Sequence, residues 1–282
     1  MTMRTRFAPS PNGYLHMGHA LSAILAHDMS RSAGGEFHLR IEDIDAGRSK
    51  PEYVEAILAD LTWLGLTWDA EPVFQSARLE SYEAAAGRLH DMGLLYPCSC
   101  TRSEIKAAAR EEGPEGPVYP GTCRDGKADL SKPHGWRLDM AQAADLANKL
   151  AGPLRWHDRC AGEVKADPAA FGDVILVRKD APASYHLAAT VDDAADGMTH
   201  IVRGMDLFTA THIHQLLQAL LELPVPIYHH HALLTGKDGR KLSKSEDAPS
   251  LRELRLGGAD GRQLANDLRE GIFPAGISRD NP

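Results

Sequence analysis

The sequence predicts an α/β fold built on a Rossmann-like parallel sheet that is split by an insertion. The chain opens with an apolar strand, a helical segment and a second strand, which is the first unit of such a sheet. The same alternation of strands and helices returns after residue 168. Between these parts glycine and proline become frequent and the cysteines cluster, which indicates a separate structural unit.

The opening unit is expected to position a ligand. Residues 3–8 fit a short buried strand, and the turn formers of residues 9–13 follow it. Apolar side chains then recur at helical spacing over residues 18–33, and residues 37–41 alternate as a strand does. Because ligands bind beyond the carboxyl ends of parallel strands, we expect a site at the turn between the first strand and its helix.

The later elements complete two halves of one sheet domain around the insertion. Further helices are expected at residues 52–64, 77–92 and 209–221, and strands at 136–140, 154–157, 173–178, 199–203 and 227–231. The predicted domains are the two halves at 1–95 and 168–246, the insertion at 96–167 and a short helical tail at 247–282.

Composition and charge narrow the function classes. Of the 282 residues, 43% are hydrophobic and 25% are charged, which is typical of a globular protein and not of a disordered one. No apolar run is long enough to cross a bilayer and the first residues lack a signal-peptide pattern, so a cytoplasmic location is expected. The net charge of −8 argues against binding nucleic acid over the whole surface but permits a local basic patch.

Two histidines mark the start of the first helix. His16 and His19 stand where helix N-terminal N–H groups attract anions. Both imidazoles can donate to phosphate oxygens, and Gly18 between them lets a flat base approach the backbone. The alternative is a pair of surface histidines at a helix cap, because a four-residue motif is a weak signal.

A lysine-rich segment lies near the other end of the chain. Lys241 and Lys244 belong to the run Lys-Leu-Ser-Lys-Ser, which follows a turn and is expected on a loop. Lysines on a loop can close over a triphosphate and neutralise a departing pyrophosphate. The alternative is an ordinary solvated basic loop.

Three cysteines have the spacing of an incomplete metal site. Cys98 and Cys100 form a Cys-x-Cys pair, and Cys123 follows a loop rich in glycine and proline. Tetrahedral Zn²⁺ needs a fourth ligand, and spacing alone admits Tyr119, Cys160 or a histidine. The layout does not suit a secreted disulfide framework, so free reduced thiols are the alternative.

The histidine and lysine motifs together, in this order, resemble those of class I aminoacyl-tRNA synthetases. Within that family the chain is similar to the glutamyl and glutaminyl branch. Nearly continuous matches lie at residues 6–16 (Arg-Phe-Ala-Pro-Ser-Pro-Asn-Gly-Tyr-Leu-His) and 39–45 (Leu-Arg-Ile-Glu-Asp-Ile-Asp). Shorter matches lie at 184–188, 191–193 and 202–206. The resemblance spans residues 4–246 and implies the Rossmann-like fold of that family.

The resemblance implies a binding site for L-glutamate. Arg6 and Arg203 would be the cationic partners of the amino acid, since guanidinium groups match carboxylates in a bidentate way. Ser10 and Tyr185 would supply hydroxyl contacts, and Glu42 would accept from the α-ammonium group. The alternative for Glu42 is an ion pair with Arg40 or another neighbour on the surface.

The resemblance also implies ATP chemistry. His16, His19 and Lys244, together with Gly18 and Lys241, would bind ATP with Mg²⁺ and stabilise the transition state of adenylate formation. The substrate carboxylate attacks the α-phosphate, so no protein nucleophile is needed. Catalysis then depends on positioning and electrostatics.

The insertion and the end of the chain favour one subgroup of the branch. Only 37 residues follow Ser245, too few for an anticodon-binding domain, so none is expected. The chain resembles shortened members that activate glutamate without tRNA and transfer it to queuosine, the modified wobble base of tRNA(Asp). Their cysteine pattern favours Tyr119 as the fourth ligand of one structural zinc. The tRNA would present its anticodon loop to a site on a monomer.

Three other functions are open on the sequence. They are a short glutamyl-tRNA synthetase that aminoacylates tRNA(Glu), a small nucleotidyltransferase and a non-catalytic synthetase-like binding module. A nucleotidyltransferase would not need Arg6, Tyr185 and Arg203 together. The intact histidine and lysine motifs argue against a module without catalysis.

Overall fold

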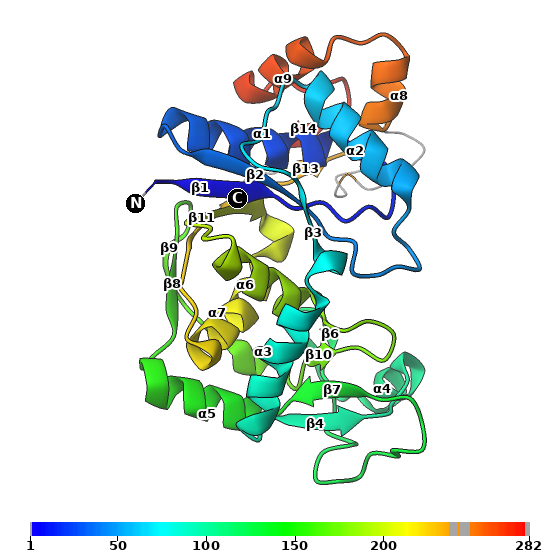
Figure 1. Ribbon diagram of the computed structural model, residues 1–282, viewed down its shortest axis with the longest axis vertical. Coiled ribbons are helices and arrows are strands. Elements are labelled where there is room, and N and C mark those ends of the chain that lie inside the picture. Colours follow the sequence, from blue (N-terminus) through cyan, green and yellow to red (C-terminus); the bar gives the residue numbers. More distant parts are fainter. Residues whose placement is uncertain (1, 237–241, 243–248, 280–282) are drawn as a thin grey trace.

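The first half of the fold is a small parallel sheet with helices on its surface. The structure is a computed structural model, in which residues 2–236, 242 and 249–279 are described. Strand β1 (Arg4–Phe7) pairs in parallel with β2 (Glu36–Ile41), and β3 (Val73–Phe74) continues the sheet. Helix α1 (Met17–Ser32) connects β1 to β2 and buries its apolar side against them (Figure 1). The expected strand–helix–strand opening is therefore present.

A second parallel pair lies beside the first. Strands β11 (His200–Gly204) and β12 (Ile227–His231) are joined by α7 (Ala210–Leu221). The backbone N–H of Thr199 donates to the carbonyl of Arg4 at 3.1 Å, which places β11 next to β1. The two crossover connections leave from this central pair in opposite directions. Such a point is where open α/β sheets bind ligands.

Part of the predicted insertion belongs to this second sheet. Strand β8 (Arg155–Asp158) pairs in parallel with β12 and in antiparallel with β9 (Gly162–Lys165). Both strands lie within the range 96–167. The pairing joins segments about 70 residues apart, and such contacts leave no local period in the sequence. The different composition of residues 96–167 therefore does not mean that this whole segment forms a sheet of its own.

The lower part of the molecule in Figure 1 is a third, antiparallel sheet with helices packed on it. Its strands are β4 (Leu95–Cys98), β7 (Gly135–Leu138) and β10 (Ile175–Val177), in the order β10–β7–β4. Helices α5 (Met140–Ala151) and α6 (Tyr185–Ala195) were not expected from the periodicity. Almost every side chain of α6 is buried or partly buried, so the helix lacks the polar face that reveals an amphipathic pattern.

Shorter or peripheral elements complete the chain. The helices are α2 (Pro51–Trp63), α3 (Leu79–Asp91), α4 (Arg102–Ala108), α8 (Leu251–Leu256) and α9 (Gly261–Glu270). The remaining strands are β5 (Glu112–Gly113), β6 (Gly116–Pro117), β13 (Leu234–Thr235) and β14 (Ser278–Arg279). Short 3-10 helices lie at Gln75–Ala77, Pro168–Phe171 and Met205–Leu207.

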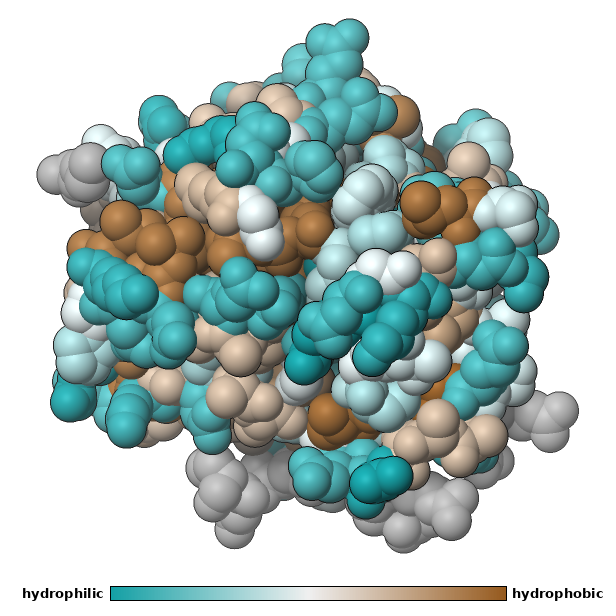
Figure 2. All heavy atoms as spheres, turned by 90° about the horizontal axis from the view of Figure 1, so that it is seen from below, coloured by the Kyte–Doolittle hydropathy of each residue, from teal (hydrophilic) through white to brown (hydrophobic). Residues whose placement is uncertain are grey.

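Two main hydrophobic clusters support these layers. One lies among the first sheet, α1, α2 and the C-terminal helices, and the other among α3, α5, α6, α7 and the antiparallel sheet. Viewed from the end where α5 lies, the surface is a mosaic of polar side chains and separate apolar areas (Figure 2). Among the helices of the described residues, none has the length and apolar character needed to cross a membrane.

Candidate active site

A cavity of about 380 Å³ opens beside the carboxyl ends of β1 and β11. Its walls come from the turn after β1, the start of α1, the end of β2, the start of α6 and the end of β11. The residues predicted to bind glutamate and ATP that are described all line it: Arg6, Ser10, His16, Gly18, His19, Glu42, Tyr185 and Arg203. Lys241 and Lys244 lie outside the described residues, although Leu242 between them lines the cavity.

His16 and His19 form the N-terminal cap of α1. His16 Nδ1 accepts a hydrogen bond from the backbone N–H of Gly18 at 3.1 Å, and His19 Nδ1 accepts one from the N–H of His16 at 3.1 Å. A neutral imidazole that accepts at Nδ1 carries its proton on Nε2, so each ring has its donor there. The two ring centroids are 3.8 Å apart. The pair is therefore both a helix cap and a wall of the cavity.

Gly18 is constrained by the same cap. A Cβ atom at this position would lie 3.1 Å from Cε1 of His16 and would crowd the ring. Gly18 also lines the cavity. The absence of a side chain thus preserves both the cap and access to the backbone at the start of α1.

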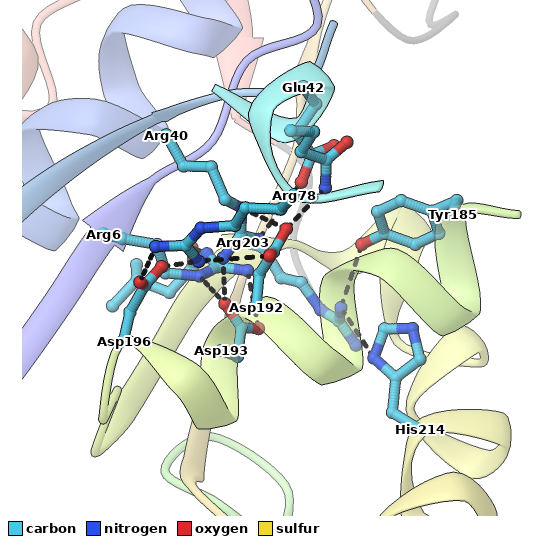
Figure 3. Close-up of polar contacts among 12 residues, drawn as sticks. Arg6, Arg40, Glu42, Arg78, Tyr185, Asp192, Asp193, Asp196, Arg203 and His214 are labelled. Atoms are coloured by element: carbon cyan, nitrogen blue, oxygen red, sulfur yellow. Dashed lines mark hydrogen bonds and ion pairs between the residues drawn. The ribbon is translucent and has the colours of Figure 1, made fainter. Parts of the chain in front are cut away.

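A buried ion network lies behind the cavity (Figure 3). It consists of Arg6, Arg40, Arg78, Glu42, Asp192, Asp193 and Asp196. Three guanidinium groups face four carboxylates, so one negative charge is in excess. Buried charges of this kind need partners and hydrogen bonds to offset their loss of water.

Asp193 on α6 is the centre of this network. It accepts from Arg6 Nε at 2.9 Å and from Arg40 Nη1 at 2.6 Å. Burial alone would raise the pKa of Asp193, but the charges and hydrogen bonds of the two arginines lower it to about 2. The carboxylate therefore stays ionised and holds both guanidinium groups in place between β1, β2 and α6.

Glu42 connects the network to the cavity. Its carboxylate accepts from Arg40 Nη2 at 3.1 Å, and its side chain is 10% exposed. Burial raises the pKa of Glu42, although Arg40 and Arg6 act in the opposite direction. An incoming cation would stabilise the ionised form of this carboxylate.

Arg203 on β11 has different surroundings from the other buried arginines. It donates to Tyr185 Oη at 3.1 Å, to His230 Nε2 at 3.0 Å and to Thr211 Oγ1 at 2.7 Å. Figure 3 shows its guanidinium directed towards Tyr185 and His214, away from the carboxylates of the network. No carboxylate of the described residues lies within 4.0 Å of it in an ion pair. Its charge is therefore suited to an anionic ligand.

Sequence reasoning did not assign roles to several residues that organise this site. Arg40 and Asp193 lie inside the matched segments 39–45 and 191–193. On the sequence Arg40 is only a possible ion-pair partner of Glu42, and its contact with Asp193 is not predicted. His230 belongs to a run of three histidines that had no assigned role, and its partner Asp158 had none either. Alternation along a strand could have indicated that His229 and His230 face opposite sides.

The predicted metal ligands converge in the loop region beside β4 and β7. The Sγ atoms of Cys98, Cys100 and Cys123 lie within 4.8 Å of one another. The hydroxyl of Tyr119 is 3.4 Å from Cys98 Sγ and 3.5 Å from Cys100 Sγ. Cys160 is exposed and contacts His229 at 3.5 Å instead. Among the described residues that spacing allowed as fourth donor, Tyr119 is the one beside the thiols.

The chemistry of the donors fits a soft divalent metal. Three sulfur atoms and one phenol oxygen around a small volume match the ligand number of Zn²⁺, although phenolate is an uncommon ligand. Arg137 adds positive charge, with Nε 3.3 Å from Cys98 Sγ and its guanidinium 3.8 Å from the ring centroid of Tyr119. Burial raises the pKa of Cys123, but hydrogen bonds from Tyr119 and the backbone of Ser99 outweigh it and lower that pKa to about 6.

Comparison with known proteins identifies the class. The family described as tRNA synthetases class I (E and Q), catalytic domain, matches residues 2–273. The chain therefore belongs to the class I tRNA synthetases of the glutamate and glutamine group, and it is a ligase. The predicted class I catalytic fold is confirmed by this match.

Individual relatives show which members of the family this chain is similar to. The chain is 48% identical over 273 residues to a glutamyl-Q tRNA(Asp) synthetase of Rhodobacter capsulatus, covering 91% of this chain and 96% of that protein. It is 41% identical to a glutamyl-Q tRNA(Asp) synthetase of Symbiobacterium thermophilum, covering 93% and 84%. A solved glutamate tRNA ligase of Elizabethkingia meningosepticum, in complex with its amino acid, superposes with a TM-score of 0.70 at 25% identity. That match covers 92% of this chain and about half, 53%, of the ligase.

Proposed function

We propose that this chain activates L-glutamate with ATP and Mg²⁺ to glutamyl adenylate without tRNA, and then transfers glutamate to queuosine in tRNA(Asp). The observation that supports the first step is a single cavity that holds the cationic Arg203, the buried carboxylate of Glu42 and the imidazole cap of α1. The second step is supported by the relatives from Rhodobacter capsulatus and Symbiobacterium thermophilum, which are glutamyl-Q tRNA(Asp) synthetases.

The cavity complements the charges of glutamate. Arg203 would bind one substrate carboxylate, and Glu42 would accept from the α-ammonium group, which also offsets the excess negative charge of the network. Arg6 is held by Asp193 through Nε and Nη2, while the contact of its Nη1 with the described residues is one of 3.5 Å to the carbonyl of Val202. This nitrogen can therefore donate a hydrogen bond to a second oxygen of the substrate.

Two hydroxyl groups complete the proposed glutamate contacts. Tyr185 Oη accepts a hydrogen bond from Arg203, so its own proton is available to a substrate carboxylate. Burial raises the pKa of Tyr185, which keeps the phenol protonated at neutral pH. Ser10 lies in the turn after β1 and lines the same cavity.

ATP would occupy the part of the cavity at the start of α1. The Nε2–H groups of His16 and His19 and the dipole of α1 favour phosphate oxygens at this point. The glutamate carboxylate attacks the α-phosphorus, the bond to the bridging oxygen of pyrophosphate breaks, and glutamyl adenylate and pyrophosphate result. Gly18 would let the nucleotide approach the backbone, and Lys241 and Lys244 would neutralise the departing pyrophosphate.

The cysteine cluster would hold one structural zinc ion through Cys98, Cys100, Tyr119 and Cys123. The bound ion would link the end of β4 to the loop that carries Cys123. It would thereby order the loops of the insertion without taking part in the reaction.

The decisive experiment separates activation from transfer. Glutamate-dependent ATP–pyrophosphate exchange is measured with all tRNA withheld, and radiolabelled glutamate is then offered to tRNA(Asp) with queuosine, to tRNA(Asp) without it and to tRNA(Glu). We expect exchange without tRNA and labelling of tRNA(Asp) only when queuosine is present. Labelling of tRNA(Glu) at its 3′ end would show a short glutamyl-tRNA synthetase instead. Exchange that requires tRNA would contradict the tRNA-independent step.

A further inference from the structure

Arg203 is connected to a buried carboxylate through a histidine. His230 on β12 is the register partner of Arg203 on β11, and Asp158 ends the adjacent strand β8. Arg203 Nε lies 3.0 Å from His230 Nε2, and His230 Nδ1 lies 2.7 Å from Asp158 Oδ2. Each of the three residues is 4% exposed or less.

The chemistry of the three groups fixes where the proton sits. A guanidinium is always protonated, so Arg203 Nε donates and His230 Nε2 must accept. The single proton of a neutral His230 is therefore on Nδ1 and is donated to Asp158. Asp158 is itself fixed, since it accepts from the backbone N–H groups of Cys160 at 2.8 Å and Ala161 at 2.9 Å.

His230 is a neutral link between two charged groups. Burial and the charge of Arg203 lower the pKa of His230 to about 3, although Asp158 acts in the opposite direction. The imidazole ring also keeps the Asp158 carboxylate out of direct contact with the guanidinium. Arg203 thus has an oriented acceptor at Nε, and no carboxylate of the described residues forms an ion pair with it.

This arrangement contrasts with the ion network next to it. Arg6 and Arg40 both pair with Asp193, which compensates much of their charge inside the protein. Among the described residues, the acceptors around Arg203 are the neutral side chains of Tyr185, Thr211 and two histidines. A buried cation with neutral acceptors gains more from an incoming carboxylate than a cation that already has one.

We propose that Asp158 and His230 are positioning residues for glutamate recognition, which orient Arg203 through a neutral acceptor and keep its charge for a substrate carboxylate. This inference rests on the proposed function of the cavity and adds a source for its specificity. Neither residue would touch the substrate. Their effect would act through the orientation and the free charge of Arg203.

The test compares a neutral and a charged side chain at position 230. His230→Gln keeps a neutral acceptor, whereas His230→Glu places a carboxylate against Arg203. We expect the Kd for glutamate, measured by calorimetry on the full chain without ATP, to rise less than about tenfold in the first variant and about a hundredfold in the second. Asp158→Asn should raise it about tenfold, because the orientation of His230 weakens.

His229 provides the matched control. It is the next residue on β12, but its ring contacts Cys160 and does not line the cavity. His229→Gln and His229→Glu should both leave the glutamate Kd within about threefold of the wild type. ATP affinity should stay within the same factor in all variants, which a general loss of structure would not allow.

Equal losses in His230→Gln and His230→Glu would overturn the proposal, since they would indicate a packing role only. If His230→Glu does not fold by circular dichroism, Thr211→Asp and Thr211→Asn repeat the comparison at the oxygen that contacts Arg203 Nη2. A charged variant no weaker than its neutral counterpart would again overturn it. Exchange activity of the wild type tests the proposed function separately, because the calorimetry reports glutamate binding alone.

Discussion

Glu42 Oε1 accepts a hydrogen bond from Arg40 Nη2 at 3.1 Å, and the same carboxylate lines the cavity between β1 and β11. The ion pair with a neighbouring arginine and a role in ligand binding were alternatives on the sequence. In the structure they are compatible, because Arg40 occupies the buried side of the carboxylate. With Glu42 included, the ion network has one more carboxylate than guanidinium group, and an ammonium group would offset that excess negative charge.

Replacing Glu42 with glutamine should weaken glutamate binding and change its pH dependence. Burial raises the pKa of Glu42, and only the ionised form pairs with an ammonium group. In the wild type the KM for glutamate should therefore rise as pH falls through that pKa. In Glu42→Gln the KM should be about tenfold higher or more at neutral pH and should vary less with pH. Glu36→Gln, at the partly exposed start of β2 and outside the cavity, is the control. A pH dependence in Glu42→Gln that parallels that of the wild type would contradict the assignment.

Removing Arg203 should affect glutamate far more than ATP. Arg203→Ala deletes the proposed carboxylate partner, so the KM for glutamate in the exchange assay should rise about a hundredfold. Arg203→Lys keeps the charge but loses the fork that contacts Tyr185, Thr211 and His230, and it should recover only part of the affinity. Arg155→Ala, on the exposed side of β8, should behave like the wild type. An equal rise in the KM for ATP would show that Arg203 does not act mainly on glutamate.

The parts of this site that the sequence could predict are the short motifs at the carboxyl ends of strands. The family resemblance singled out Arg6, Ser10 and Glu42, and the apolar pattern of the strands that they end or follow predicted where a site would form. The link between Asp158 and His230 could not, because the two residues are 72 positions apart and hydrogen bonds over such a span leave no periodic signal.

The insertion shows the same limit of sequence reasoning. Cysteine spacing indicated which side chains belong together, but it left three kinds of fourth ligand open. The folded loop places the hydroxyl of Tyr119 within 3.5 Å of two thiols, whereas Cys160 lies in the turn between β8 and β9. Likewise, the parallel pairing of β8 with β12 depends on the packing of both sheets and not on the local sequence.

Loss of a cysteine from the cluster should remove zinc, whereas loss of the isolated one should not. Elemental analysis of the wild type should show about one zinc per chain, and Cys98→Ser should lose it and melt at a lower temperature. Cys160→Ser is the matched control, since Cys160 lies outside the cluster. Tyr119→Phe keeps the three thiols and should bind zinc more weakly. A wild type free of metal, or an unchanged metal content in Cys98→Ser, would remove the site.

The buried position of Asp193 should make it far more important for stability than a surface aspartate with a similar pKa. Arg6 and Arg40 lower the pKa of Asp193 to about 2, and Arg269 and His27 lower that of the half-exposed Asp28 to about 2 as well, in both cases against the opposing effect of burial. At pH 7, Asp193→Asn removes the carboxylate that two buried guanidinium groups share, and it should lower the free energy of unfolding by about 3 kcal/mol.

Asp28→Asn breaks a pair that is screened by water and should cost less than about 1 kcal/mol. Because a carboxylate with a depressed pKa stabilises the fold above its unfolded pKa of about 3.8, the difference between the wild type and Asp193→Asn should persist at neutral pH. It should shrink as pH falls from about 4 towards 2, where the native carboxylate becomes protonated. Urea unfolding at several pH values measures both effects. Equal losses in the two variants would contradict a buried network that depends on Asp193.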